Sequence, residues 1–275
     1  MIALIDADIL PYEFGGMVQL EEPDQPLAWE IVRSMVDDRI QQILEATSAT
    51  SHKLYLTDSS SNFRMELATI KPYKGHRKTE KPYHWEAIRQ HLIDNWGAEV
   101  QYGIEADDRL GIEQMKTPYQ CNLHQAMKDI DDTVICSRDK DLNMIPGWHY
   151  VWPAGKQKEQ LWFQDELSAI RCFYRQLLTG DPADNILGLY GVGASSQLVK
   201  SLEGFDQEQL MFEHVYKAYQ DRFGTYATQF MWENAALLWI MREEPYVDDL
   251  YGHKHPAAEI ENRLDNLLAR LADEQ

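Results

Sequence analysis

Aspartate and glutamate recur in five short clusters along this chain, and their type and spacing suggest metal chemistry. Carboxylates that converge from separate elements repel one another unless a cation lies between them. Hard divalent cations prefer oxygen ligands, and two such ions a few ångströms apart are the usual apparatus of phosphodiester hydrolysis. The first hypothesis is therefore a metal-dependent nuclease. Its candidate metal ligands are Asp6, Asp58, Glu105, Asp107, Asp108, Asp139, Asp141, Asp181 and Asp184.

Three of these clusters follow short apolar runs that suit strands buried on both faces of a parallel sheet. In open α/β sheets, ligands bind beyond the carboxyl ends of the strands. Acids at these ends are therefore expected to lie close together. The runs are residues 2–5 before Asp6, 53–57 before Asp58 and 133–136 before Asp139. For Asp8, two residues after Asp6, we prefer a solvated or capping role over a ligand role, with a supporting role behind the ligands left open.

Helical periodicity fills the intervals between the strands, over residues 27–46 and 85–96. A further helix is expected to start at Glu105. Acids in a first turn are stabilised by the helix dipole, so capping is the simplest explanation of this cluster. Glu105 and Asp108, three residues apart, also share a helix face and could both point at one metal.

The sequence thus predicts an α/β fold with a mostly parallel central sheet flanked by helices, followed by a helical part. We place the α/β core in residues 1–160, with a short basic segment near 71–96 that precedes a strand-like run at 98–102. Residues 161–275 are expected to be mostly helical. The helical patterns there are 166–178, 195–202 and 209–241, and residues 143–149 are expected to form a turn.

The segment from Leu178 to Ser196 combines two acids with a glycine-rich turn. Gly191-Val-Gly193 before a helix would let a phosphate approach backbone amides. A lone G-x-G is weak evidence, because glycines also punctuate ordinary loops. Its proximity to Asp181 and Asp184 strengthens the interpretation as a nucleic-acid contact coupled to the acids.

The net charge of −19 argues at first sight against nucleic acid, because affinity for a polyanion comes mostly from Lys and Arg. The clustered acids account for almost half of this excess and would be offset by bound metal. The distribution of basic residues matters more than the total, and residues 71–81 hold five of them, although such a run is often merely a solvated surface. The absence of a long apolar stretch and of cysteine pairs leads us to expect a cytoplasmic protein without a membrane span or signal peptide.

Six motifs taken in order resemble those of the metal-dependent 5′-nuclease (flap endonuclease) superfamily, and most of all the 5′→3′ exonucleases of T7-type bacteriophages. They are L-I-D, T-D…F-R, Y-K-G-H-R, E-A-D-D, S-R-D-K-D and G-D-P-A-D-N-I-L-G…G-V-G. The resemblance covers residues 2 to about 241. It implies a PIN-like nuclease fold with a helix–three-turn–helix element near 178–202, and for a phage protein a location in the host cytoplasm.

The resemblance also implies roles for individual residues. The nine acids would line a two-metal site for Mg²⁺ or Mn²⁺, and Lys74 and Arg77 would neutralise charge on the scissile phosphate. Tyr73 would stack on a terminal base, and the glycine turn would grip duplex backbone around a potassium ion. The implied partners are DNA with a 5′ end, a flap or an RNA–DNA hybrid, together with replication proteins. The other residues expected to contact DNA are Lys71, Lys78, Gly191, Gly193, Ser195, Ser196 and Lys200.

Two departures from the family pattern concern substrate binding. The family usually has Lys or Arg directly after G-x-G, whereas this chain has Ala194, Ser195 and Ser196, and its nearest cation is Lys200. The segment after Arg77 is also short, which predicts poorer handling of long flaps than of recessed or blunt 5′ ends.

Two alternative functions remain open. A haloacid-dehalogenase-type phosphatase would use the first aspartates as nucleophile and acid, but it leaves E-A-D-D and D-K-D unexplained. A structure-specific DNA-binding protein without nuclease activity is the other alternative. So many carboxylates facing DNA count against it, because a pure binder gains nothing from them.

Overall fold

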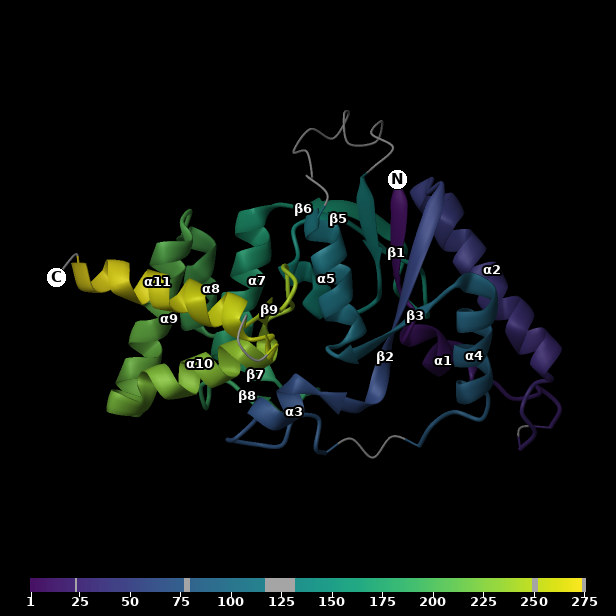
Figure 1. Cartoon of the computed structure of the whole chain (residues 1–275), viewed down its shortest axis with the longest axis horizontal. Helices are drawn as coiled ribbons and strands as arrows, with labels where there is room; N and C mark the ends of the chain where they lie inside the picture. Colours follow the sequence, from purple (N-terminus) through teal and green to yellow (C-terminus); the bar gives the residue numbers. More distant parts are fainter. Residues whose placement is uncertain (23, 77–79, 117–131, 249–251, 274–275) are drawn as a thin grey trace. The chain divides into compact units, whose positions relative to one another are not determined.

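The computed structural model describes residues 1–22, 24–76, 80–116, 132–248 and 252–273 (Figure 1). The chain forms two compact units, which we describe separately. Unit 1 comprises residues 1–60, 78–142 and 147–164, and unit 2 comprises residues 61–77, 143–146 and 165–275. The sequence prediction had one boundary after residue 160, whereas two earlier segments group with the helical unit.

Unit 1 contains a six-stranded sheet of order β3-β2-β1-β4-β5-β6. Strand β1 pairs in parallel with β2 and with β4, and β4 pairs in parallel with β5, while β6 is antiparallel to β5. The mostly parallel sheet predicted from the apolar runs is confirmed. Its strands are β1 (Ile2–Asp6), β2 (Ser51–Asn62), β3 (Glu99–Gly103), β4 (Thr133–Cys136), β5 (Gly147–Val151) and β6 (Gln160–Gln164).

Helices cover both faces of this sheet. Buried residues of α2 recur every three or four positions, as a helix that buries one stripe requires. They share a core with Ala3 and Ile5 of β1, whereas α5 contacts β1 and β4 without joining that core cluster. Side chains alternate along a strand, so Leu4 points to the opposite face of the sheet from Ala3 and Ile5. The helices of unit 1 are α1 (Ile9–Phe14), α2 (Trp29–Thr47), α4 (Trp85–Trp96) and α5 (Ala106–Lys116).

Unit 2 is mainly helical, as predicted for the C-terminal part. A short two-stranded ladder, β7 with β8, follows α7, and a second ladder, β9 with β10, precedes α11. The helices are α3 (Phe63–Leu67), α7 (Glu166–Thr179), α8 (Gln197–Lys200), α9 (Glu208–Phe223), α10 (Ala227–Leu238) and α11 (Ala258–Asp273). The strands are β7 (Gly180–Asp181), β8 (Ile186–Leu187), β9 (Tyr246–Val247) and β10 (Lys254–His255), and 3₁₀ turns occupy Ser201–Gly204 and Gly224–Tyr226. A further 3₁₀ turn is Lys140–Met144, of which residues 140–142 belong to unit 1.

Arg64 explains why residues 61–77 belong to the helical unit. Its side chain is buried and donates to the backbone carbonyls of Leu237, at 3.0 Å, and Trp239, at 2.6 Å. These carbonyls lie at the end of α10, where four acceptors lack partners within the helix. Glu233 adds a second link by accepting hydrogen bonds from the backbone of Thr69 and Ile70, each at 2.7 Å.

Two details of the sequence prediction are wrong. Residues 143–149 were expected to form a turn, but Gly147 already begins strand β5, so the Pro146-Gly147 turn signal falls at the start of the strand. The helical pattern over 209–241 is interrupted at Gly224, and α10 ends at Leu238. None of the helices in the described ranges combines the length and the apolar character needed to cross a membrane.

Candidate functional site

The predicted metal ligands divide between the two units. Seven lie in unit 1, and Asp181 and Asp184 lie in unit 2. Asp6 ends β1, Asp139 follows β4, and the acids at 105–108 lie at the start of α5. Asp58 was expected directly after a strand, but it lies inside β2, which continues to Asn62. The seven are Asp6, Asp58, Glu105, Asp107, Asp108, Asp139 and Asp141.

The ends of β1 and β4 are joined by a chain of hydrogen bonds. The Ser137 hydroxyl donates to Oδ2 of Asp6 at 2.7 Å and accepts from the backbone N–H of Asp139 at 2.9 Å. The backbone N–H of Asp141 in turn donates to Oδ1 of Asp139 at 2.8 Å. Because β1 and β4 are parallel neighbours, Asp6 and Asp139 lie near each other beyond the carboxyl ends of these strands.

Asp6 lies in an environment that disfavours its charge. Burial, followed by repulsion from the Asp8 and Asp139 carboxylates, raises its pKa to about 7, although the Ser137 hydroxyl opposes the shift. A cation beside Asp6 would reverse this effect, since an opposite charge favours the ionised carboxylate. The local charge therefore suits a cation.

Asp8 has a role that the sequence only partly suggested. Its Oδ1 accepts from Nη1 of Arg89, and its Oδ2 accepts from the backbone N–H of Thr57, both at 2.9 Å. Nη2 of Arg89 also donates to the Thr57 carbonyl at 2.9 Å, and the Thr57 hydroxyl accepts from the N–H of Ala106 at 2.9 Å. This network joins the residues after β1 to β2, α4 and the start of α5. Burial raises the pKa of Asp8, against the effect of Thr57 and Arg89.

The acids at the start of α5 have different environments. Asp108 is fully buried, and its Oδ2 accepts from the backbone N–H of Glu105 at 3.0 Å, so its carboxylate caps the helix. Glu105 and Asp107 are partly exposed. Ala106 between them is held by Thr57, directly before Asp58, whose carboxylate accepts from the Ser60 hydroxyl. Four candidate acids are therefore tied to a shared backbone framework.

The donor set fits a hard divalent cation, because it consists of carboxylate oxygens, with one buried beside like charges. As the side chains stand, no group of three or more His, Cys, Asp or Glu residues within the described ranges is arranged to hold a metal ion. The framework thus places acid-bearing segments together, while the carboxylates themselves do not form a closed ligand cage.

In unit 2, Tyr73 and Lys74 meet Asp184. The Tyr73 hydroxyl donates to Oδ2 of Asp184 at 2.8 Å, and Nζ of Lys74 lies 3.7 Å from the same oxygen. The backbone N–H of Lys74 donates to the Asp184 carbonyl at 2.9 Å, and Asn185 donates to the Pro72 carbonyl at 2.9 Å. Two motifs more than 100 residues apart in sequence therefore form one cluster.

Tyr73 is too deeply buried to stack on a terminal base, the role that the resemblance implied. Its ring is only 6% exposed and belongs to the core of unit 2, so it presents no face on which a base could stack. Its hydroxyl instead anchors Asp184.

Asp181 is also buried, and its Oδ1 accepts from the N–H of Ala183 at 2.8 Å.

The glycine turn, for which the sequence predicts a contact with DNA, is exposed. Gly191, Gly193, Ser195 and Lys200 are exposed, whereas Ser196 caps the four-residue helix α8 by accepting from the N–H of Val199 at 3.3 Å. Lys71 is exposed as well. Arg77 and Lys78 lie outside the described residues.

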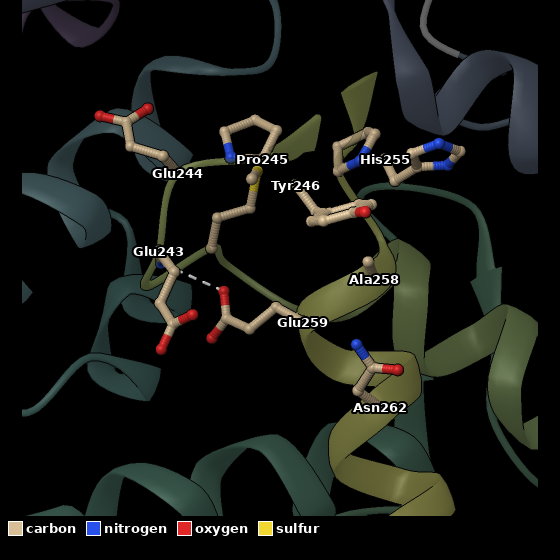
Figure 2. A pocket seen from close by; sticks show the side chains of 10 residues that line it. Glu243, Glu244, Pro245, Tyr246, His255, Ala258, Glu259 and Asn262 are labelled. Atoms are coloured by element: carbon tan, nitrogen blue, oxygen red, sulfur yellow. Dashed lines mark hydrogen bonds between the residues drawn. The ribbon is translucent and has the colours of Figure 1, made fainter. Parts of the chain in front are cut away.

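A separate cavity of about 180 Å³ lies in unit 2, between the segment after α10 and the start of α11 (Figure 2). Glu259 lines it and accepts from the backbone N–H groups of Arg242, at 2.9 Å, and Glu243, at 3.2 Å. Burial raises the pKa of Glu259 in spite of these bonds. None of the metal ligands or DNA contacts predicted from the sequence lines this cavity.

No protein-family model matches the chain, and no curated protein sequence matches it. Among solved structures, the chain is similar to the bacteriophage T5 D15 flap endonuclease, with a TM-score of 0.48, 15% identity, and 86% of this chain and 98% of that one covered. It is also similar to human GEN1 in complex with Holliday junction DNA, with a TM-score of 0.49, 11% identity, and 96% and 66% covered. The catalytic core of Rad2 with DNA gives a TM-score of 0.44, 14% identity, and 98% and 92% covered.

Proposed function

We propose that this chain is a divalent-metal-dependent nuclease that hydrolyses phosphodiester bonds near DNA 5′ ends. The observation that carries the proposal is the meeting of Asp6 and Asp139 at the ends of parallel strands β1 and β4, with Asp6 buried beside like charges. A protein that only bound DNA would gain nothing from this repulsion, because DNA is itself a polyanion.

We assign the residues as follows. Asp6, Asp58, Glu105, Asp107, Asp139 and Asp141 would hold a metal ion in unit 1, and Asp181 and Asp184 are proposed ligands of a second ion. When bound, two divalent ions such as Mg²⁺ or Mn²⁺ supply an activated water and neutralise charge during phosphodiester hydrolysis. Asp108 would fix the first turn of α5, so that Glu105 and Asp107 keep their direction.

Lys74 and Arg77 are proposed to bind the phosphate. Lys74 has φ of 52°, an uncommon conformation for a non-glycine residue. Its backbone bond to Asp184 and the ion pair with that carboxylate hold it in place. A fixed cation of this kind can stabilise the charge that develops on the phosphate in the transition state. Tyr73 would support this arrangement by anchoring Asp184.

The phosphatase alternative finds less support in the geometry. It would require Asp8 to act on the substrate, but both oxygens of Asp8 are engaged by Arg89 and Thr57. An activity assay distinguishes the nuclease from a DNA-binding protein without nuclease activity.

The test is cleavage of a 5′-labelled duplex, with and without EDTA, by the wild type and by Asp139→Asn/Asp141→Asn. We expect Mg²⁺- or Mn²⁺-dependent release of short 5′ products, with a loss of at least about 10²-fold in the double variant. Asp38→Asn/Glu45→Gln, which changes two exposed acids of α2, is the matched control and should keep full activity.

Cleavage in EDTA, or full activity of Asp139→Asn/Asp141→Asn, would overturn the mechanism. DNA binding in Mn²⁺ without cleavage by the wild type would identify the non-catalytic alternative. Rapid turnover of p-nitrophenyl phosphate would identify the phosphatase.

A further inference from the structure

The loop after β8 presents one tyrosine to solvent. Leu189 is buried, and the N–H of Val192 donates to the Leu189 carbonyl at 3.0 Å, which closes a tight turn. Tyr190 lies at the exposed side of this turn and is 89% exposed. Gly191, with φ of 80°, and Gly193 have no neighbour within 4 Å of the position a Cβ would take. A ligand therefore has open access to Tyr190.

Arg222, in the last turn of α9, is fixed against this tyrosine. Its Nη2 donates to the backbone carbonyl of Tyr190 at 3.1 Å, and its Cζ lies 5.5 Å from the centre of the Tyr190 ring. A guanidinium has five N–H donors, so a single bond to a carbonyl leaves most of them for another acceptor. No local sequence pattern indicates this pair, because 32 positions separate the two residues.

The charge of Arg222 is not balanced by a carboxylate within the part of the chain that the structure describes. The adjacent Asp221 lies 3.8 Å from Lys217 instead, and Glu203 after α8 lies 2.6 Å from Arg175. In a chain with 45 acidic and 26 basic residues, an exposed arginine without an acidic partner is a local positive site. A negatively charged ligand is the matching chemistry.

We propose that Tyr190 and Arg222 together bind a phosphate of the duplex DNA backbone. The guanidinium would pair with the phosphate, and the tyrosine hydroxyl would donate to an oxygen of the same strand. Arg222 would thereby supply, from a different helix, the cation that is absent from Ala194-Ser195-Ser196. This inference rests on the proposed function, since it names a contact for the same DNA substrate.

The test is the affinity for a fluorescent duplex in EDTA, measured over a series of salt concentrations. Arg222→Gln should raise Kd about tenfold and lower the slope of log K against log salt by about 1. Tyr190→Phe, which keeps the ring and removes the hydroxyl, should raise Kd about two- to threefold. Arg222→Lys keeps the charge and should recover most of the salt slope.

Arg270→Gln is the matched control, because Arg270 is also exposed and lies in the last turn of another helix of unit 2. It should leave Kd unchanged within about twofold. An unchanged Kd and salt slope in Arg222→Gln would overturn the proposal, as would an equal loss in Arg270→Gln. If the wild type fails to cleave DNA in Mg²⁺, the nuclease proposal fails, whereas the comparison of Kd values still decides this one.

Discussion

At the scale of single residues, Asp8 shows how its hydrogen-bond partners make a carboxylate a structural support. Arg89 and Thr57 hold both of its oxygens, and Thr57 also binds the backbone between Glu105 and Asp107. We therefore expect Arg89 to be a positioning residue, which would act on the proposed metal ligands through Asp8 and Thr57.

We expect Arg89→Gln to lower kcat by about 10- to 100-fold with little change in KM, because the acids would lose their alignment while substrate contacts remain. The free energy of unfolding should also fall, by about 1–3 kcal/mol, since Asp8 would lose its charged partner. Steady-state cleavage rates and urea unfolding measure the two effects.

Arg33→Gln is the control, since Arg33 is exposed on α2 of the same unit. It should change neither quantity. A loss of stability in Arg89→Gln with unchanged kcat would reduce Arg89 to a structural residue. Partial recovery of kcat in Arg89→Lys would support positioning by charge.

At the scale of elements, Glu113 attaches α5 to the sheet. It accepts from Nζ of Lys53 on β2 at 2.6 Å and from Nζ of Lys116 at 2.8 Å. Burial raises the pKa of Glu113, but the hydrogen bonds from Lys116 and Lys53 outweigh it, and the net pKa lies below the usual value. A carboxylate with a lowered pKa stabilises the folded state above its unfolded pKa.

We expect Glu113→Gln to lower the free energy of unfolding by about 0.5–1 kcal/mol at pH 7, since the lysines are half exposed and solvent screens the pairs. The difference from the wild type should persist above about pH 5 and vanish as the pH falls below the unfolded value of about 4.3 and through the folded pKa. Urea unfolding at a series of pH values measures it. A difference that grew on acidification would contradict the assigned direction.

The β7–β8 ladder depends on two glycines in contact. Gly180 has φ of 69°, and a Cβ there would clash with the backbone of Gly188 and Ile186. Gly180→Ala should therefore lower the free energy of unfolding by at least about 3 kcal/mol. Gly191→Ala, at a similar φ but with open space, should cost only about 1 kcal/mol. Equal losses in thermal melts would show that the ladder is not tightly packed.

At the scale of the whole molecule, the net charge is −19, so a bound cation would relieve repulsion between carboxylates and stabilise the folded state. A ligand that binds only the folded state stabilises it by about 2.7 kcal/mol at 100 times its Kd. We expect Mg²⁺ or Mn²⁺ to raise the melting temperature of EDTA-treated protein by about 5–10 °C. Asp6→Asn should abolish most of this rise, and should not lower the metal-free melting temperature, because it removes a buried charge beside two others.

Calorimetric scans with and without metal test this expectation. Asp38→Asn, on the exposed surface of α2, makes the same change in net charge and should keep the full response to metal. A metal response of Asp6→Asn equal to that of the wild type would place the bound ion elsewhere.

The sequence by itself determined the strands β1, β2 and β4, most helices, and the positions of Asp6 and Asp139 at the ends of β1 and β4. Burial of a strand or of one helix face imposes a local pattern, so these features can be read from neighbouring residues. Strand β5 was harder to predict, because Pro146-Gly147 is a typical turn signal and stands at the point where the strand begins.

Only the tertiary structure decided which side chains hold the acids. Arg89 reaches Asp8 across 81 positions, and Tyr73 reaches Asp184 across 111. The pair of Arg222 and Tyr190, 32 positions apart, is likewise formed only by the fold. Such pairs arise from the packing of elements and leave no periodic trace in the sequence. The strand-end positions of Asp6 and Asp139 could thus be predicted because each follows a local apolar run, whereas the supporting partners of the acids depend on contacts that only the folded chain creates.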